Sequence, residues 1–268
     1  MEYSAPELIQ SLRLAINTFF DNRRGMNIRY SMEDVVLGAF SVFLTQSPSF
    51  LAFQRTMQEK TGRDNGASLF TIQSLPTDDQ IRNVLDDVTP ESVFPVFTTC
   101  FEQLIKNGDI SQFKSELGYL VALDGTQYFS SDKIHCDNCL TKTDKKTAKV
   151  TYYHTVITPV VVKPGEEHVL SLIPEFIRPQ DATGKDPSPS GRAKKQDCEN
   201  TAAKRWLKRY GKTLSQIQEA ASTTILGDDL YSRQPVIEAI TEVGLGYMLV
   251  CKRESHPWLY DWVDQLEL

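Results

Sequence analysis

The sequence predicts a protein of the α+β or α/β class, with a helical N-terminal domain followed by a mixed sheet and flanking helices. Up to about residue 115, apolar residues recur three and four positions apart, which is typical of amphipathic helices. From about residue 118, short apolar runs separated by turn residues indicate strands. The expected domains are therefore residues 1–115 and residues 116–268.

The helices of the first region are indicated by the residues at which they begin. Residues 6–16 form an amphipathic segment that opens with proline. Ser31, which two acids follow closely, predicts the cap of a helix whose apolar face is supplied by residues 35–44. Thr77 predicts a second cap, and Pro90 predicts the first turn of a further helix.

The second region is predicted to contain three antiparallel strands, a helix, a strand, a helix and a strand. The strands are expected at residues 119–123, 150–162, 168–176, 223–227 and 247–252, and the helices at residues 197–210 and 234–243. Residues 178–195, rich in Pro, Gly, Ser and Lys, are expected to form a loop. This order is that of the ribonuclease H-like fold, in which the first and fourth strands are neighbours.

Two of these strands deliver a carboxylate at their ends. Asp124 ends the apolar run that begins at Tyr119, and Asp228 ends the run that begins at Thr224. Neighbouring strands can place such acids side by side, and paired carboxylates are how proteins hold Mg²⁺ or Mn²⁺. The pair therefore predicts metal-dependent chemistry on a phosphodiester. The alternative is that both acids merely end strands as turn residues.

The charge distribution gives a mixed indication about nucleic acid. A net charge of −6 is unusual for a DNA-binding protein, but basic residues concentrate in residues 142–149 and 192–212. A stripe at helical spacing contains Lys204, Arg205, Lys208, Arg209 and Lys212, and Arg192, Lys194 and Lys195 precede it in the adjoining loop. The stripe predicts contacts with DNA phosphates, and a solvated helix face is the alternative.

The cysteines argue for a reducing compartment and offer a second metal site. Five cysteines form an odd, scattered set, and the chain has neither a secretion signal nor an apolar run long enough to cross a membrane, so a cytoplasmic protein is expected. Cys136 and Cys139, with His154, could bind Zn²⁺ and staple a turn to a strand, with His135 as a further ligand. They could equally be two buried thiols and a satisfied histidine.

Several stretches together carry a resemblance to a known family. They are residues 75–82, 123–130, 135–139, 152–154, 196–199, 227–232 and 249–256. Through them the chain resembles DDE-type transposases of bacterial insertion sequences, whose ribonuclease H-like core carries three acids. The resemblance implies that Asp124 is the first acid and Asp228 the second, since Tyr231 stands three positions after it. Asp229 is the fallback.

The third acid is not found at a recognisable position. The resemblance implies a glutamate well beyond the second aspartate, but only 268 − 228 = 40 residues follow Asp228. Neither Glu254 nor Glu267 lies in a recognisable motif, so we expect a C-terminally truncated transposase. Three further acids lie in the third predicted strand and at the helix start: Glu175, Asp197 and Glu199. They are expected to be structural, although Glu199 could instead lean into the acidic site.

The activity that the resemblance implies is cleavage and strand transfer of DNA at transposon ends and target, with two Mg²⁺ or Mn²⁺ ions. The resemblance also implies a homodimer. The helices of the N-terminal domain could include a DNA-binding helix-turn-helix. Three rival functions remain open. The chain could be a ribonuclease H-like nuclease that only hydrolyses, a non-catalytic DNA-binding remnant that inhibits the intact transposase, or a zinc-stapled interaction module.

Overall fold

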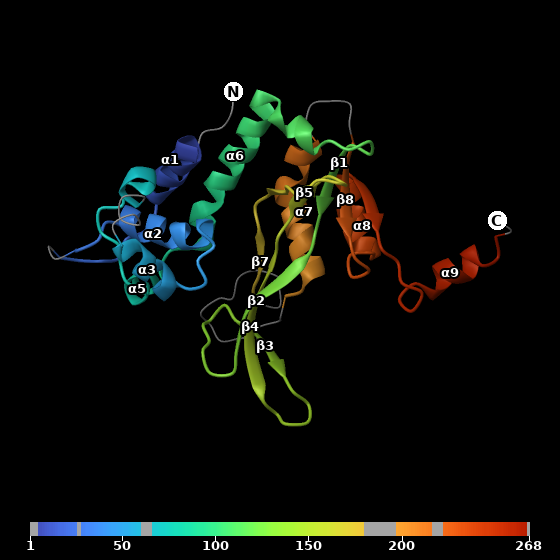
Figure 1. Ribbon diagram of the computed structural model, residues 1–268. Coiled ribbons are helices and arrows are strands. Elements are labelled where there is room, and N and C mark those ends of the chain that lie inside the picture. The colour runs from blue at the N-terminus through green and yellow to red at the C-terminus, as the bar shows by residue number, and fades with distance from the viewer. Residues whose placement is uncertain (1–4, 26–27, 60–65, 180–196, 216–221, 267–268) are drawn as a thin grey trace. The chain divides into compact units, whose positions relative to one another are not determined.

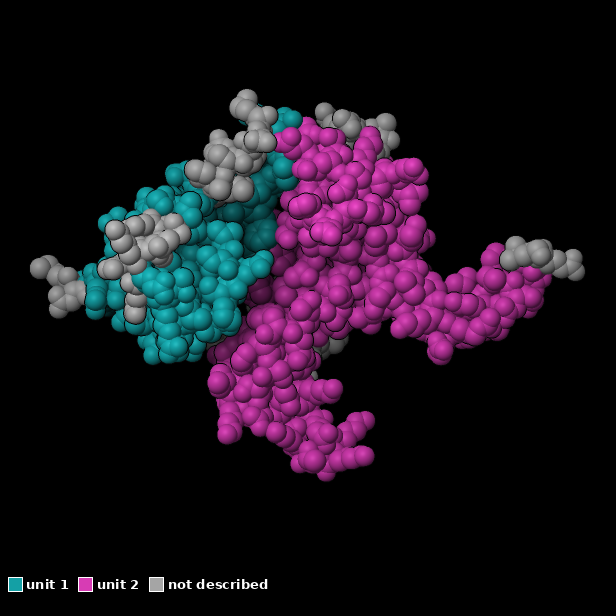
Figure 2. All heavy atoms as spheres, viewed as in Figure 1, with its two compact units in different colours: residues 1–107 teal, residues 108–268 magenta. Residues whose placement is uncertain are grey.

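The computed structural model describes residues 5–25, 28–59, 66–179, 197–215 and 222–266. The chain divides into two compact units, residues 1–107 and residues 108–268 (Figure 2). The division comes a few residues before the expected boundary at residue 115, because the short 3-10 helix η2 (Asp109–Phe113) groups with the second unit. Whether the units are separate domains stays a prediction.

The first unit is built from helices (Figure 1). They are α1 (Ala5–Ile16), α2 (Met32–Leu44), α3 (Phe50–Gln58), α5 (Asp78–Leu85), the 3-10 helix η1 (Pro90–Val93) and α6 (Phe94–Asn107). Both predicted caps are confirmed, since the hydroxyl of Ser31 accepts from the backbone N–H of Asp34 and that of Thr77 from Gln80.

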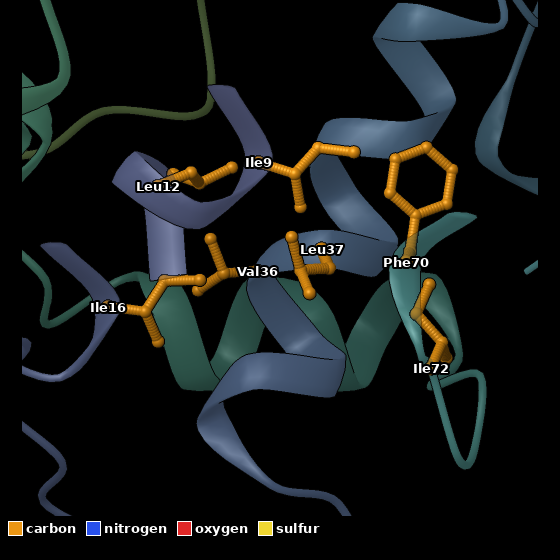
Figure 3. Packing of buried hydrophobic residues seen from close by; sticks show 7 residues of the cluster. All are labelled: Ile9, Leu12, Ile16, Val36, Leu37, Phe70 and Ile72. Carbon is orange, nitrogen blue, oxygen red and sulfur yellow. The ribbon is translucent and has the colours of Figure 1, made fainter. Parts of the chain in front are cut away.

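The core of the first unit lies between α1, α2 and residues 70–72. Its cluster contains Ile9, Leu12, Ile16, Val36, Leu37, Phe70 and Ile72 (Figure 3). One buried carboxylate borders this core: Asp34, in the first turn of α2, accepts a hydrogen bond of 2.8 Å from the backbone N–H of Gln73. The carboxylate thereby satisfies a backbone donor, and its negative charge interacts favourably with the positive end of the helix dipole.

The second unit combines strands with helices, so the chain is a mixed α and β protein. Its strands are β1 (Tyr119–Ala122), β2 (Gly125–Ser131), β3 (Leu140–Thr143), β4 (Val150–Ile157), β5 (Val160–Val162), β6 (Leu170–Ser171), β7 (Glu175–Ile177), β8 (Thr223–Gly227) and β9 (Gly246–Leu249). Its α-helices are α7 (Glu199–Ser215), α8 (Gln234–Glu242) and α9 (Pro257–Val263).

Five strands form one sheet in the order β6-β5-β1-β8-β9. β1 pairs antiparallel with β5 and parallel with β8, and β8 pairs parallel with β9. The first and fourth predicted strands are therefore neighbours, and the arrangement is compatible with a ribonuclease H-like fold.

A second sheet surrounds β4, which pairs with β2 along one edge and with β3 and β7 along the other. Strands β2 and β3 lie in segments for which no strand was predicted, and the expected strands at residues 150–162 and 168–176 are each divided in two. Pro159 precedes β5 and Pro174 precedes β7, and proline has no N–H to continue a ladder.

Helix α7 packs its buried face against β7 and α8. Trp206 is 1% exposed and donates its indole N–H to the carbonyl of Ile173 at 2.8 Å. The helix continues past Gly211, where the sequence predicted its end, to Ser215. Gly211 is buried instead, and an added Cβ would lie 2.7 Å from Val243, so this glycine permits close packing rather than ending the helix.

Two arginines of the predicted basic stripe are tied into an ion-pair network. Arg205 bonds Glu175 at 2.8 Å and Asp197 at 2.7 Å, and Arg209 bonds Glu175 at 3.1 Å. Burial lowers the pKa of Arg205, but its hydrogen bonds to Asp197 and Glu175 outweigh this and raise the pKa above its ordinary value. Glu175 and Asp197 are thus structural, as expected. Arg192, Lys194 and Lys195 lie outside the described residues.

Replacing Glu175 tests this network. Glu175→Ala leaves Arg205 with one carboxylate and Arg209 with none, so we expect a loss of about 3 kcal/mol in the free energy of unfolding. Chemical denaturation measures this loss. Lys208→Ala removes an exposed charge from the same helix and should change stability by less than about 0.5 kcal/mol. An equal effect of the two substitutions would contradict the network's role.

Candidate active site

The parallel pairing of β1 with β8 brings the two predicted aspartates to the same edge of the sheet. Ala122 is in register with Leu226, and the N–H of Leu123 donates to the carbonyl of Leu226 at 2.9 Å. Continued by two positions, this register places Asp124 opposite Asp228. Both residues are exposed at the carboxyl ends of their strands, where ligands of open α/β sheets bind.

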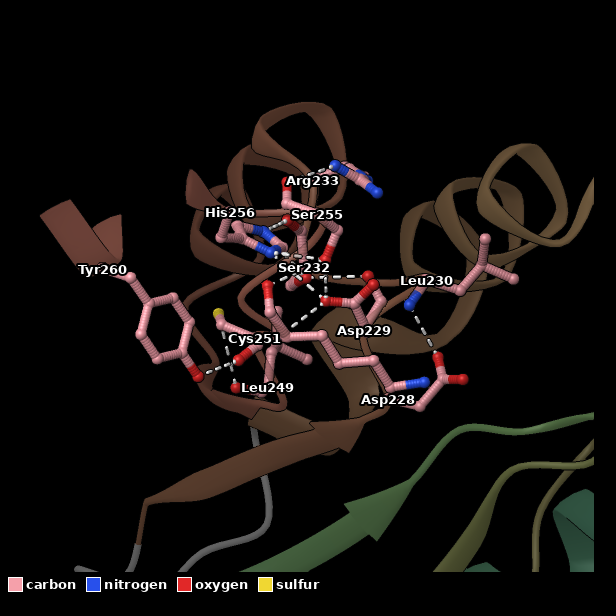
Figure 4. A network of polar contacts seen from close by, with 11 residues as sticks. Asp228, Asp229, Leu230, Ser232, Arg233, Leu249, Cys251, Ser255, His256 and Tyr260 are labelled. Atoms are coloured by element: carbon pink, nitrogen blue, oxygen red, sulfur yellow. Dashed lines mark hydrogen bonds and ion pairs between the residues drawn. The ribbon is translucent and has the colours of Figure 1, made fainter. Parts of the chain in front are cut away.

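Asp228 and Asp229 point in different directions (Figure 4). Among the described residues, the carboxylate of Asp228 accepts a single, local hydrogen bond of 2.9 Å, from the N–H of Leu230. Asp229 instead accepts from the N–H of Lys252 at 2.8 Å and from the hydroxyl of Ser255, and it lies 3.2 Å from His256. Through these contacts the side chain of Asp229 anchors the loop after β9. This structural role of Asp229 supports the choice of Asp228 as the second acid.

The hydrogen bonds of Asp229 also stabilise its charged form. The hydroxyl of Ser255 contributes most and the backbone N–H of Lys252 next, and together they hold the pKa of Asp229 below its usual value. An aspartate whose oxygen already accepts these hydrogen bonds is a poor metal ligand, because binding a cation would require breaking them.

Glu199, at the first position of α7, faces the two aspartates. Burial raises the pKa of its carboxyl, a hydrogen bond from Tyr231 partly opposes this, and the charges of Asp124 and Asp228 raise the pKa further. Three carboxylates therefore share one electrostatic environment. A structural role was favoured for Glu199, with a place in the acidic site as the alternative, and its electrostatic coupling to Asp124 and Asp228 supports the alternative. The sequence could not decide between the two, because an acid at a helix start gives no signal of which strand ends it approaches.

Tyr231 holds the carboxylate of Glu199 in place. Its side chain is 1% exposed, and its hydroxyl donates to Oε2 of Glu199 at 3.3 Å. Burial first, and then the charge of Glu199, raise the pKa of Tyr231 far above its ordinary value, so the hydroxyl keeps its proton and remains a donor.

Gly125 makes room for this carboxylate. A Cβ added at Gly125 would lie 2.3 to 2.6 Å from the three carboxylate atoms of Glu199, far inside van der Waals contact. The glycine that follows Asp124 is therefore required by the approach of Glu199 and not by the turn alone.

The three acids fit a divalent cation by their chemistry. Asp124, Asp228 and Glu199 offer only oxygen donors, which Mg²⁺ and Mn²⁺ prefer. Burial is the main reason that the pKa of Glu199 is raised, and the charges of Asp124 and Asp228 add a smaller contribution that a cation would offset. The carboxylates are spread more widely than a compact ligand set. Within the described residues, Cys136, Cys139 and His154 alone form a group of three such side chains whose ligand atoms all lie within 4.8 Å of one another.

The remaining predicted residues have separate positions. Cys136, Cys139 and His154 are brought together, whereas the ring of His135 stacks on Tyr152 with centroids 4.4 Å apart. Glu254 is exposed in the turn after β9, and Glu267 lies outside the described residues.

Comparison with known proteins gives little further information. No protein-family model and no curated protein matches the chain. A solved structure described as a piggyBac transposase synaptic complex with hairpin DNA is similar at 15% identity and a TM-score of 0.34, covering 93% of this chain and 49% of that one. This chain thus spans about half the length of that transposase. Because this likeness is so weak, the function proposed for the chain is argued from its own residues.

No helix in the described part of the chain combines the length and apolar character needed to span a bilayer.

Gly125→Ala tests the cation site without removing a ligand. The new methyl group would displace the carboxylate of Glu199, so we expect Mg²⁺ or Mn²⁺ to bind about tenfold more weakly, as measured by calorimetry or by the electron paramagnetic resonance of Mn²⁺. Gly38→Ala is the matched control, since its Cβ would meet no atom closer than 3.6 Å. Equal affinity in both variants would show that Glu199 does not serve the cation.

Proposed function

We propose that this chain is a DNA-cleaving and strand-transferring enzyme of the DDE transposase type, acting on the ends of an insertion sequence. The observation that carries the proposal is the register of β1 and β8, which sets Asp124 opposite Asp228. Carboxylates paired across neighbouring strand ends are suited to holding the divalent cations of phosphodiester chemistry.

Asp124, Asp228 and Glu199 would hold these cations. Bound Mg²⁺ or Mn²⁺ supplies charge neutralisation at the phosphate and activation of the attacking oxygen. Glu199 is the third carboxylate of the proposal, in place of a glutamate beyond Asp228. Its position at the N-terminus of α7 favours its negative charge, and the hydroxyl of Tyr231 orients it.

The other residues of the site fix the acids before the substrate arrives. The N–H of Leu230 restrains Asp228, and the contacts of Asp229 anchor the loop that follows β9. Such restraint matters because in-line displacement at phosphorus depends chiefly on positioning and on electrostatic stabilisation.

DNA would be held by basic side chains outside the ion-pair network. On α7, Lys208 and Lys212 are exposed, whereas Arg205 is fully engaged with Glu175 and Asp197. Exposed lysines provide contacts with phosphates that do not depend on sequence. We therefore propose that the exposed lysines of the basic stripe, and not all of its residues, contact DNA.

The direct test is cleavage of duplex DNA that carries the sequences flanking the gene on both sides, in the presence of Mg²⁺ or Mn²⁺. Asp124→Ala removes a cation ligand, so the rate of cleavage should fall at least about 100-fold. Asp132→Ala, which removes an exposed aspartate paired with Lys149 in the same unit, should cleave at the unchanged rate. Cleavage by Asp124→Ala at the original rate would reject the assignment.

A wild-type chain that binds these ends without metal and never cleaves them would favour the alternative, a non-catalytic DNA-binding protein that inhibits an intact transposase. Hydrolysis of DNA without joining to a target would favour a simple nuclease. The strand-transfer assay separates these outcomes, because joined products appear only when a 3′ end attacks a second duplex.

The adjacent aspartates provide a second test. Asp228→Asn should abolish cleavage while leaving the melting temperature nearly unchanged, because Asp228 makes only a local hydrogen bond. Asp229→Asn should lower the melting temperature by a few degrees and leave more cleavage activity, because it weakens the bonds to Lys252 and Ser255. The reverse pattern in thermal melts and cleavage assays would identify Asp229 as the ligand.

A further inference from the structure

A compact group of two thiols and an imidazole lies apart from the acids. Cys136 and Cys139 belong to the connection between β2 and β3, and His154 lies on β4, paired in register with Phe129 of β2. Cys139 is buried, Cys136 is exposed, and His154 is partly buried. The proposed catalytic function uses none of these side chains.

The distances within this group match those around a tetrahedral zinc ion. With Zn–S of about 2.3 Å and Zn–N of about 2.0 Å, tetrahedral geometry separates two sulfurs by about 3.8 Å and a sulfur from a nitrogen by about 3.5 Å. The two Sγ atoms are 3.8 Å apart, and Nε2 of His154 lies 3.4 Å from Sγ of Cys136 and 3.3 Å from Sγ of Cys139. All three separations are close to the expected values at once.

A disulfide does not account for this arrangement. A disulfide requires sulfurs about 2.05 Å apart, and both cysteines are free. Two simple thiols would not require Nε2 of a histidine to face both sulfurs at nearly equal distance.

The backbone of the turn supports the sulfurs as ligands. The N–H of Cys136 donates to Sγ of Cys139 at 3.3 Å, and the N–H of Cys139 donates to the carbonyl of Cys136 at 3.2 Å. An N–H directed at sulfur stabilises the negative charge that a metal-bound thiolate carries. The Cys-x-x-Cys segment is therefore folded back on itself with both sulfurs on one side.

Aromatic side chains fix the orientation of the imidazole. The ring of His154 stacks on Tyr128 with centroids 5.7 Å apart and planes 13° apart, and Phe129 contacts it at 5.6 Å. Restraint of this kind keeps Nε2 directed at the sulfurs. Metal sites depend on such outer contacts to orient their ligands.

We propose that Cys136, Cys139 and His154 bind one zinc ion, with solvent at the fourth coordination position beside the exposed Cys136. Thiolate and imidazole select zinc over Mg²⁺, so this site is chemically distinct from the carboxylates. His135 does not belong to the group of ligand atoms that lie within 4.8 Å of one another, so it is not the fourth ligand in this arrangement. The ion links the β2–β3 connection to β4 and so stabilises the second sheet.

The test measures metal directly in the full chain, purified with its thiols reduced. We expect about one equivalent of zinc per chain, and replacement by Co²⁺ should produce thiolate-to-cobalt charge-transfer absorption. Cys139→Ser should weaken binding of Co²⁺ at least about tenfold and reduce this absorption. Cys251→Ser, outside the cluster, is the matched control and should bind as the unmodified chain does.

Two results would overturn the proposal. One is a reduced chain that retains no zinc and gives no charge-transfer absorption with Co²⁺. The other is equal binding of Co²⁺ by the Cys139→Ser and Cys251→Ser variants.

A second measurement covers the case in which Cys139→Ser does not fold. A zinc chelator should lower the melting temperature of the unmodified chain, and added Zn²⁺, but not Mg²⁺, should restore it. A melting temperature unaffected by the chelator, in a chain from which zinc has been removed, would contradict the structural role. Asp124→Ala should still bind zinc, so failure of the zinc site and failure of the catalytic proposal can be told apart.

Discussion

The parallel ladder between β1 and β8 is the constraint on which the candidate active site depends. It joins two strands that lie far apart in the chain and fixes their register through pairs such as Ala122 with Leu226. A shift of one residue would move every side chain of a strand to the other face of the sheet. The register of this ladder therefore carries both Asp124 and Asp228 to the same edge of the sheet.

The acid group and the thiol–imidazole group are linked through the same stretch of chain. Asp124 stands between β1 and β2, and β2 pairs with β4, which carries His154. The five-stranded sheet holds one end of this stretch, and the second sheet holds the other. Stabilising β4 would therefore restrain the segment that follows Asp124, including Gly125, whose lack of a side chain admits Glu199.

Local chemistry determined what could be predicted from the sequence. The caps at Ser31 and Thr77 were predictable because a capping hydroxyl acts within three residues, and β1, β8 and β9 were predictable from their apolar runs. Strands β2 and β3 were missed because their sequences are largely polar and carry no apolar run. The position of Glu199 beside the aspartates was not predictable, because it depends on how α7 crosses the strand ends. The division of long strands at Pro159 and Pro174 was missed although proline supplies the signal.

The long separation between β1 and β8 also has a consequence for how the molecule folds. Tyr119 pairs with Thr223, which lies about a hundred residues later in the chain. Closing so long a loop costs conformational entropy, and this cost arises before the contacts between the strands can stabilise the pair. During synthesis, the edge of β1 that pairs with β8 in the folded protein stays unpaired until β8 has been made. The antiparallel partners β5 and β6 are much nearer to β1 in the chain than β8 is, so the parallel half of the sheet is the part that local contacts support least.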